Sequence, residues 1–213
     1  GLKLSTIIIG YAGGNLLVTA VFAAVLLWVI GLAVPITATY IIAAVIVAPA
    51  FTQLGVPEYA AHMFIFYYAL LSEVSPPTAL SPFAAAAITG GDPYKTTFMA
   101  WKYALPAFLL PFVFTVLPSG RAILLHFEGV GIAAGIWTII AAFLGIGMLA
   151  SGCAGWFLKR STILERVIII VGALAFVYPH RLGDVAGFVC LFIVIAMQKL
   201  RKDKEPEQAR VAA

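Results

Sequence analysis

An uncharged apolar run from Gly129 to Phe157 constrains the fold of this chain more than any other feature. As a helix rising 1.5 Å per residue, this run is long enough to cross the roughly 30 Å hydrocarbon core of a bilayer. Only 10% of all residues are charged, whereas about 25% are charged in a soluble domain. Backbone polar groups in lipid must be satisfied within the segment, which favours helices. The sequence therefore predicts an all-α polytopic membrane protein with roughly five to seven membrane segments.

Basic residues lie at the ends of the apolar segments, as the positive-inside rule requires. One side of the predicted topology carries most of them, and we expect this side to be cytoplasmic: Lys95, Lys102, Lys159, Arg160, Arg166 and the cluster Lys199–Lys204. The opposite side carries Arg121 and Arg181. We therefore predict a cytoplasmic C-terminus with a tail over 201–213. The net charge of +4 does not indicate nucleic acid binding, because no basic patch is interleaved with aromatic residues.

The apolar segment at about 14–54 is interrupted in its middle. Leu16–Ile30 and Ile41–Phe51 flank the sequence Gly31–Tyr40, and each arm would be about 17–23 Å long, too short to cross alone. Non-helical backbone at membrane depth is tolerated only where it is buried in protein or lines a water-filled cavity. We therefore predict a re-entrant hairpin that enters from outside. One kinked helix, or two full spans, are the alternatives. The predicted tip contains Gly31, Pro35, Thr37 and Thr39.

A second interruption divides the segment at about 57–90. Pro76 and Pro77 lack backbone donors and force the preceding residue out of the helical region, so we predict a broken helix with freed carbonyls between Ser72 and Ser75. Oxygen ligands without a full carboxylate cage suit a singly charged cation such as Na⁺, and half-helix N-termini suit an anion. A structural kink relieved by neighbouring helices is the alternative. The predicted Na⁺ ligands are Thr37, Ser72, Ser75 and Thr78.

Two ionisable residues lie inside the broken segment. Glu73 is an intramembrane acid and hence a candidate functional residue, although it could simply face a hydrated vestibule. His62 is expected near the outer end, and Glu58 and Asp92 at the membrane interface. The complete predicted substrate and ion site is Gly31, Pro35, Thr37, Thr39, Ser72, Glu73, Ser75, Pro76, Pro77 and Thr78.

The sequence predicts further membrane helices in the rest of the chain. Gly90–Pro93 is a strong breaker, after which we predict an interfacial helix over Tyr94–Ala100 and a span over about 101–117. Residues 119–200 form a carboxy-terminal extension of about three helices.

The run Gly31–Tyr40, followed by Leu54–Thr96, resembles the large permease subunit of the tripartite ATP-independent periplasmic (TRAP) transporters. The form it resembles most has its small and large membrane subunits fused. The order G-x-x-x-P-x-T-A-x-Y and then S-x-x-S-P-P carries the resemblance, which covers Leu2 to about Pro118. Thr78 departs from the apolar residue that many relatives have after the two prolines.

The resemblance implies an elevator-type carrier of the bacterial inner membrane that is built from inverted repeats. It would import small organic anions, such as carboxylates, with Na⁺ as coupling ion and no other cofactor. Its implied partners are a periplasmic binding protein and a small membrane subunit or fused amino-terminal region. Residues 1–118 would form the second half-repeat, and the first would precede Gly1.

We predict that the chain is not an enzyme. Its three histidines, His62, His126 and His180, lie far apart and lack acidic partners at catalytic spacing. A structural or channel-type membrane subunit without coupled transport is the remaining alternative.

Overall fold

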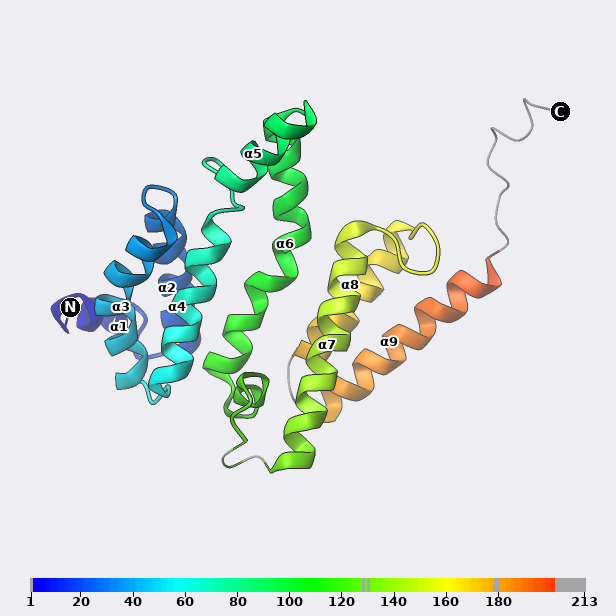
Figure 1. Cartoon of the computed structure of the whole chain (residues 1–213). Coiled ribbons are helices and arrows are strands. Elements are labelled where there is room, and N and C mark those ends of the chain that lie inside the picture. Colours follow the sequence, from blue (N-terminus) through cyan, green and yellow to red (C-terminus); the bar gives the residue numbers. More distant parts are fainter. Residues whose placement is uncertain (1, 128, 130, 178–180, 202–213) are drawn as a thin grey trace.

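A computed structural model describes residues 2–127, 129, 131–177 and 181–201 (Figure 1). Most of the described chain is helical. The predicted tail beyond Arg201 lies outside the described residues.

Four of the six helices in the first half of the described chain pack around one apolar core. The fully buried side chains of Leu27, Phe51, Phe64 and Phe114 lie at its centre. The rings of Phe51 and Phe64 meet edge to face at 5.0 Å between centroids. The six helices are α1 (Leu2–Tyr11), α2 (Leu16–Gly31), α3 (Ile36–Gln53), α4 (Glu58–Ser72), α5 (Leu80–Thr89) and α6 (Pro93–Val116).

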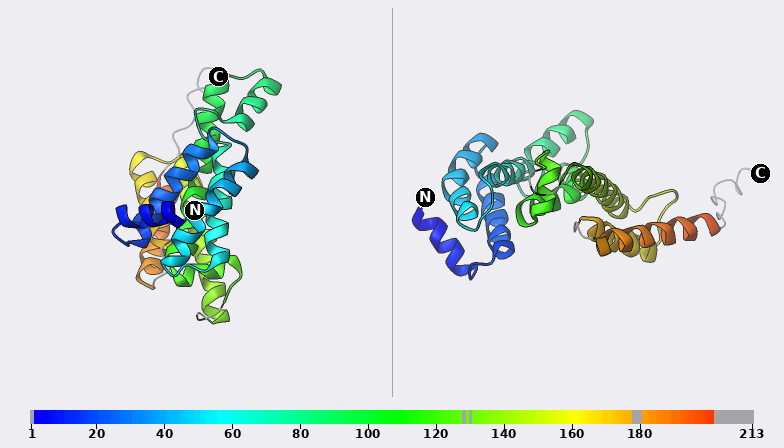
Figure 2. Two further views of the ribbon diagram at one scale, coloured as in Figure 1. Left: turned by 90° about the vertical axis from the view of Figure 1, so that its left-hand side faces the viewer. Right: turned by 90° about the horizontal axis from the view of Figure 1, so that it is seen from below.

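The second half forms a separate bundle of three helices beside α6 (Figures 1 and 2). After the 3₁₀ helix η1 (Pro118–Leu124), the bundle consists of α7 (Ile132–Ala154), α8 (Ile163–Val177) and α9 (Arg181–Leu200). Its core contains Met148, Ile169, Phe176 and Val194. Small residues bring these helices close together, as is common between membrane helices: a Cβ at Gly187 would lie 2.5 Å from the Phe176 ring.

Within the described residues, four helices, α3, α6, α7 and α9, are long and apolar enough to cross a membrane, and α2 and α5 are shorter apolar helices. Helices α6 to α9 alternate in direction (Figure 1). The start of α6 with Lys95, the end of α7 before Lys159 and the end of α9 with Lys199 therefore share one end of the molecule. The chain is thus an all-α, multi-pass membrane protein.

One predicted boundary near α6 is wrong. The interfacial helix Tyr94–Ala100 and the following span are a single 24-residue helix. The side chain of Asp92 accepts a hydrogen bond from the Lys95 N–H at 2.9 Å, and Pro93 occupies the first turn, where its missing donor is harmless. These two residues start a helix at the breaker, and Pro106 and Pro111 lie inside it without ending it.

The second arm of the hairpin also differs from its prediction. Helix α3 begins at Ile36 and has 18 residues, about 27 Å of helix, so it is long enough to cross by itself. This length fits the two-span alternative as well as a hairpin. Thr37 and Thr39 consequently lie in the first turns of α3 rather than in the non-helical tip.

Candidate functional site

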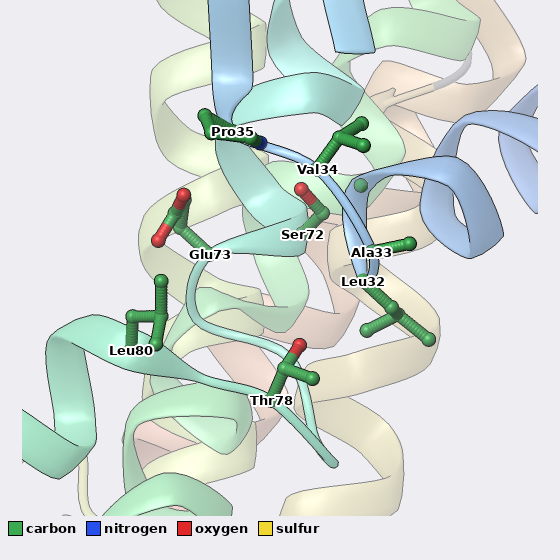
Figure 3. A pocket seen from close by; sticks show the side chains of 9 residues that line it. Leu32, Ala33, Val34, Pro35, Ser72, Glu73, Thr78 and Leu80 are labelled. Atoms are coloured by element: carbon green, nitrogen blue, oxygen red, sulfur yellow. The ribbon is translucent and has the colours of Figure 1, made fainter. Parts of the chain in front are cut away.

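A cavity of about 290 Å³ lies where the α2–α3 turn meets the break between α4 and α5 (Figure 3). Both interruptions of the sequence therefore contribute to one site. Its lining residues are Gly31, Leu32, Ala33, Val34, Pro35, Ser72, Glu73, Thr78 and Leu80.

The α2–α3 turn is a short non-helical segment between Gly31 and Ile36. Pro35 precedes α3 with φ −59° and ψ 156°, a conformation that stops α2 from continuing. The hydroxyl of Thr39 donates to the Val34 carbonyl at 3.1 Å and so ties the turn to the start of α3. Gly31 packs directly on Ser72, because a Cβ at Gly31 would overlap the Ser72 side chain.

The break after α4 extends from Glu73 to Ala79 and contains both prolines. The Ser72 hydroxyl donates to the Ala69 carbonyl at 2.7 Å, and the Ser75 hydroxyl donates to the Leu71 carbonyl at 2.8 Å. Both hydroxyl protons are thus used, while the oxygen lone pairs remain free to accept or to bind a cation.

The backbone of the break is more fully bonded than predicted. The Ser72 carbonyl accepts from the Ser75 N–H at 3.2 Å, and the Ser75 carbonyl accepts from the Ala79 N–H at 3.1 Å. The prediction of freed carbonyls is therefore wrong for these two residues, because turn-type bonds replace the lost helical ones. Side-chain oxygens are the better ligand candidates.

Oxygen atoms of three side chains line the cavity from different directions (Figure 3). The Ser72 hydroxyl lies in the middle, the half-buried Glu73 carboxylate points toward Pro35, and Thr78 stands on the opposite side. Among the described residues that line the cavity, Glu73 is the only charged one and none is basic. The site is therefore suited to a cation rather than to an anion.

The structure brings together five of the ten predicted site residues: Gly31, Pro35, Ser72, Glu73 and Thr78. The other five do not line the cavity. Ser75 is buried beneath the break, and Thr39 is buried on α3. Thr37 is exposed, as is Pro77, and Pro76 is half-buried.

The apolar lining residues Leu32 to Val34 and Leu80 were not predicted from the sequence. Their only signal is their position beside the two motifs. They give the cavity a hydrophobic wall, of which Ala33 and Leu80 are themselves exposed.

His62 lies in the first half of α4, away from the break. The Tyr40 hydroxyl lies 2.8 Å from its Nδ1 atom, and a Glu58 carboxylate oxygen lies 3.9 Å from its Nε2 atom. This polar group joins α3 to α4 and does not line the cavity. Across the described residues, no group of three or more His, Cys, Asp or Glu side chains could hold a metal ion.

Comparison with known protein families gives one match. The model of a family described as "Tripartite ATP-independent periplasmic transporter, DctM component" matches residues 1–119. This range includes the α2–α3 turn and the α4–α5 break, whereas α7, α8 and α9 follow it. Neither the comparison with curated proteins nor that with solved structures gave a match.

Proposed function

Because the chain belongs to the DctM component family of the tripartite ATP-independent periplasmic transporters, we propose that its cavity binds the Na⁺ ion that drives a coupled permease. Permeases of this family work with a binding protein and a small subunit. The proposed cargo is a small organic anion, a carboxylate, that a periplasmic binding protein delivers at the inner membrane.

The observation that carries this proposal is the oxygen set of the cavity. Ser72 and Thr78 supply hydroxyl oxygens and Glu73 supplies one negative charge. One carboxylate with neutral oxygens suits a singly charged cation, because a divalent ion usually recruits several carboxylates. Ser75 does not line the cavity, and the hydrogen bond from its hydroxyl to the Leu71 carbonyl holds the backbone of the break.

The α2–α3 turn forms one wall of the same cavity. In an elevator-type carrier a helical hairpin opens and closes over the substrate, and the tip of α2–α3 is the part of this chain that could do so. Under this proposal a bound cation links the tip to the break, so that the tip closes only when Na⁺ is present. The carboxylate of the cargo would then need a basic partner outside the described cavity lining.

Ser72→Ala is expected to raise the Na⁺ concentration for half-maximal uptake about fivefold, because it removes one ligand with a net contribution of about 1 kcal/mol. Glu73→Gln should act in the same direction, by about tenfold, since it removes the charge. Uptake of a labelled carboxylate into proteoliposomes that contain the full permease, with the purified binding protein outside, measures both effects.

Ser81→Ala is the matched control, since Ser81 is exposed on α5 and does not line the cavity. Wild-type Na⁺ dependence in both the Ser72 and Glu73 variants would place the ion elsewhere. Flux that needs neither Na⁺ nor the binding protein would support the channel-type alternative instead.

A reporter fused after Ala213 is expected to be active in the cytoplasm. The reason is the shared end of α6, α7 and α9, where Lys95, Lys159 and Lys199 gather. A second reporter, one that is active only in the periplasm, should be active when it is fused at Leu125, after η1 and at the other end of α6. The opposite pattern of activity would reverse the proposed orientation.

A further inference from the structure

Helix α3 follows the turn that forms one wall of the cavity, and the apolar core holds this helix only in part. The first residue of α3 in the fully buried core is Ala43, about two turns after the helix begins at Ile36. Thr39 is buried before that point, but its hydroxyl donates to Val34 in the α2–α3 turn itself. The fully buried apolar core therefore does not include the first two turns of α3.

Tyr40 and His62 form a side-chain contact between this part of α3 and helix α4. The Tyr40 hydroxyl lies 2.8 Å from Nδ1 of His62, and the two ring centroids are 5.9 Å apart. A phenol can donate and accept, so the hydrogen bond forms with either neutral tautomer of the imidazole. Tyr40 is half-buried and also packs against the core, and the His62 side chain is 34% exposed. The Tyr40–His62 pair therefore joins the second turn of α3 to α4 at a partly shielded position.

A cavity of about 460 Å³ lies beside the Tyr40–His62 pair, so apolar packing alone does not join the two helices here. The other nitrogen of His62, Nε2, lies 3.9 Å from a carboxylate oxygen of Glu58 on the same helix. The Glu58 side chain is 82% exposed, so this ion pair contributes little. The contact at Nδ1 is therefore the one that connects α3 with α4. The cavity is lined by Ala44, Ala48, Pro49, Thr52, Glu58 and His62.

We propose that His62 is a positioning residue of the candidate site: through Tyr40 it holds the start of α3, and with it the α2–α3 turn, against α4. Helix α4 also carries Ser72, about 15 Å further along its axis. Both walls of the cavity therefore depend on one helix for their relative position. The bond from Thr39 to Val34 connects the start of α3 to a lining residue, so a shift of α3 moves that wall.

Hydrogen–deuterium exchange of the full permease without Na⁺, followed by mass spectrometry, tests the positioning directly. Tyr40→Phe removes only the hydroxyl group. The backbone amides of residues 33–41 should then exchange about fivefold faster, which is the size expected for one net hydrogen bond. The amides of residues 141–149 in α7 are the internal control and should exchange at the wild-type rate. Unchanged exchange at residues 33–41 in Tyr40→Phe would overturn the proposal.

Two replacements of His62 separate the contact at Nδ1 from the rest of the ring. Asparagine carries its amide on Cγ, where histidine carries Nδ1, whereas glutamine carries its amide one bond further out, as Nε2 is. His62→Gln should speed exchange at residues 33–41 about fivefold, and His62→Asn by less than about twofold. Helix propensity alone predicts the opposite order, because asparagine is the poorer helix former. Glu58→Ala should leave exchange unchanged. Equal acceleration in His62→Asn and His62→Gln would overturn the role of Nδ1.

The consequence for transport rests on the proposed Na⁺ site. Tyr40→Phe and His62→Gln should raise the Na⁺ concentration for half-maximal uptake about fivefold, because Na⁺ must then stabilise a less favourable position of the turn. His62→Asn should not raise it. Wild-type Na⁺ dependence in Tyr40→Phe, together with the expected shift in Ser72→Ala, would overturn the role of His62 in the Na⁺ site. If Ser72→Ala and Glu73→Gln also keep wild-type Na⁺ dependence, the Na⁺ site itself is wrong, and exchange at residues 33–41 still decides whether His62 positions the turn.

Discussion

Gly31→Ala is expected to lower the initial rate of uptake at least about fivefold. The new methyl group would overlap both Oγ and Cβ of Ser72. The Ser72 Cβ is fixed to its backbone at the end of α4, so a rotamer change cannot relieve the overlap, and the α2–α3 turn must move away from the break. Overpacking of this kind raises the free energy by about 1–3 kcal/mol, and each 1.4 kcal/mol corresponds to about tenfold. This free-energy cost destabilises the arrangement in which the α2–α3 turn packs on the end of α4.

A rescue experiment separates this local overlap from general misfolding. In a Ser72→Gly background the partner of the clash is gone, so adding Gly31→Ala should lower the rate no further. Gly147→Ala in α7 is the control for glycine replacement in a helix, because nothing lies within 4 Å of its added Cβ. Equal rate losses from Gly31→Ala in the wild-type and Ser72→Gly backgrounds would show that the Gly31–Ser72 contact is not the cause.

Glu165→Ala is expected to lower the melting temperature of the purified protein on the order of 10 °C. Glu165 is 2% exposed and binds Arg201, whose Nη1 atom lies 3.0 and 3.1 Å from its two carboxylate oxygens. The same carboxylate accepts the Thr162 N–H at 2.8 Å, while the Thr162 hydroxyl accepts the Glu165 N–H at 3.3 Å. This reciprocal pair is a capping box that starts α8.

The network extends to the end of α9. Gln198, which is fully buried, donates to Glu165 at 3.3 Å and accepts the N–H groups of Leu158 and Lys159 at 3.0 and 3.2 Å. Removal of the carboxylate loses hydrogen bonds to a charged group, which contribute about 1.5–3 kcal/mol each, while Arg201 is 33% exposed and stays accessible to water. A domain of about this size loses roughly 2–4 °C per kcal/mol, which gives the expected shift.

Thermal unfolding in detergent, followed by circular dichroism, measures this effect. Glu58→Ala is the matched control, because the Glu58 side chain is 82% exposed and lies 3.9 Å from His62; it should shift the melting temperature little. Glu165→Ala and Arg201→Ala should be clearly non-additive when combined, since both disrupt one network. If the Glu165→Ala protein has the same melting temperature as the wild type, the network does not stabilise the bundle.

The break between α4 and α5 could be predicted from the sequence alone. Pro76 and Pro77 remove backbone donors from their own positions, and α4 ends and α5 begins on either side of them. Composition likewise determined the membrane class, because a chain with so few charges cannot cover a soluble surface. Both effects are local or summed over the chain, so neither depends on which helices become neighbours. The capping box of Thr162 and Glu165 is likewise a local feature, because its pattern lies within four consecutive residues.

Which side chains meet depends on the tertiary structure. Thr37 and Ser75 had the chemistry predicted for Na⁺ ligands, yet neither lines the cavity, because the direction of a side chain depends on the residue at which its helix begins and on how that helix is rotated. The start of α3 at Ile36 turned Thr37 outward and buried Thr39. Glu165 gained Gln198 and Arg201 only because α9 runs back alongside α8. Contacts between residues distant in sequence arise from packing of whole helices, and no local pattern encodes that packing.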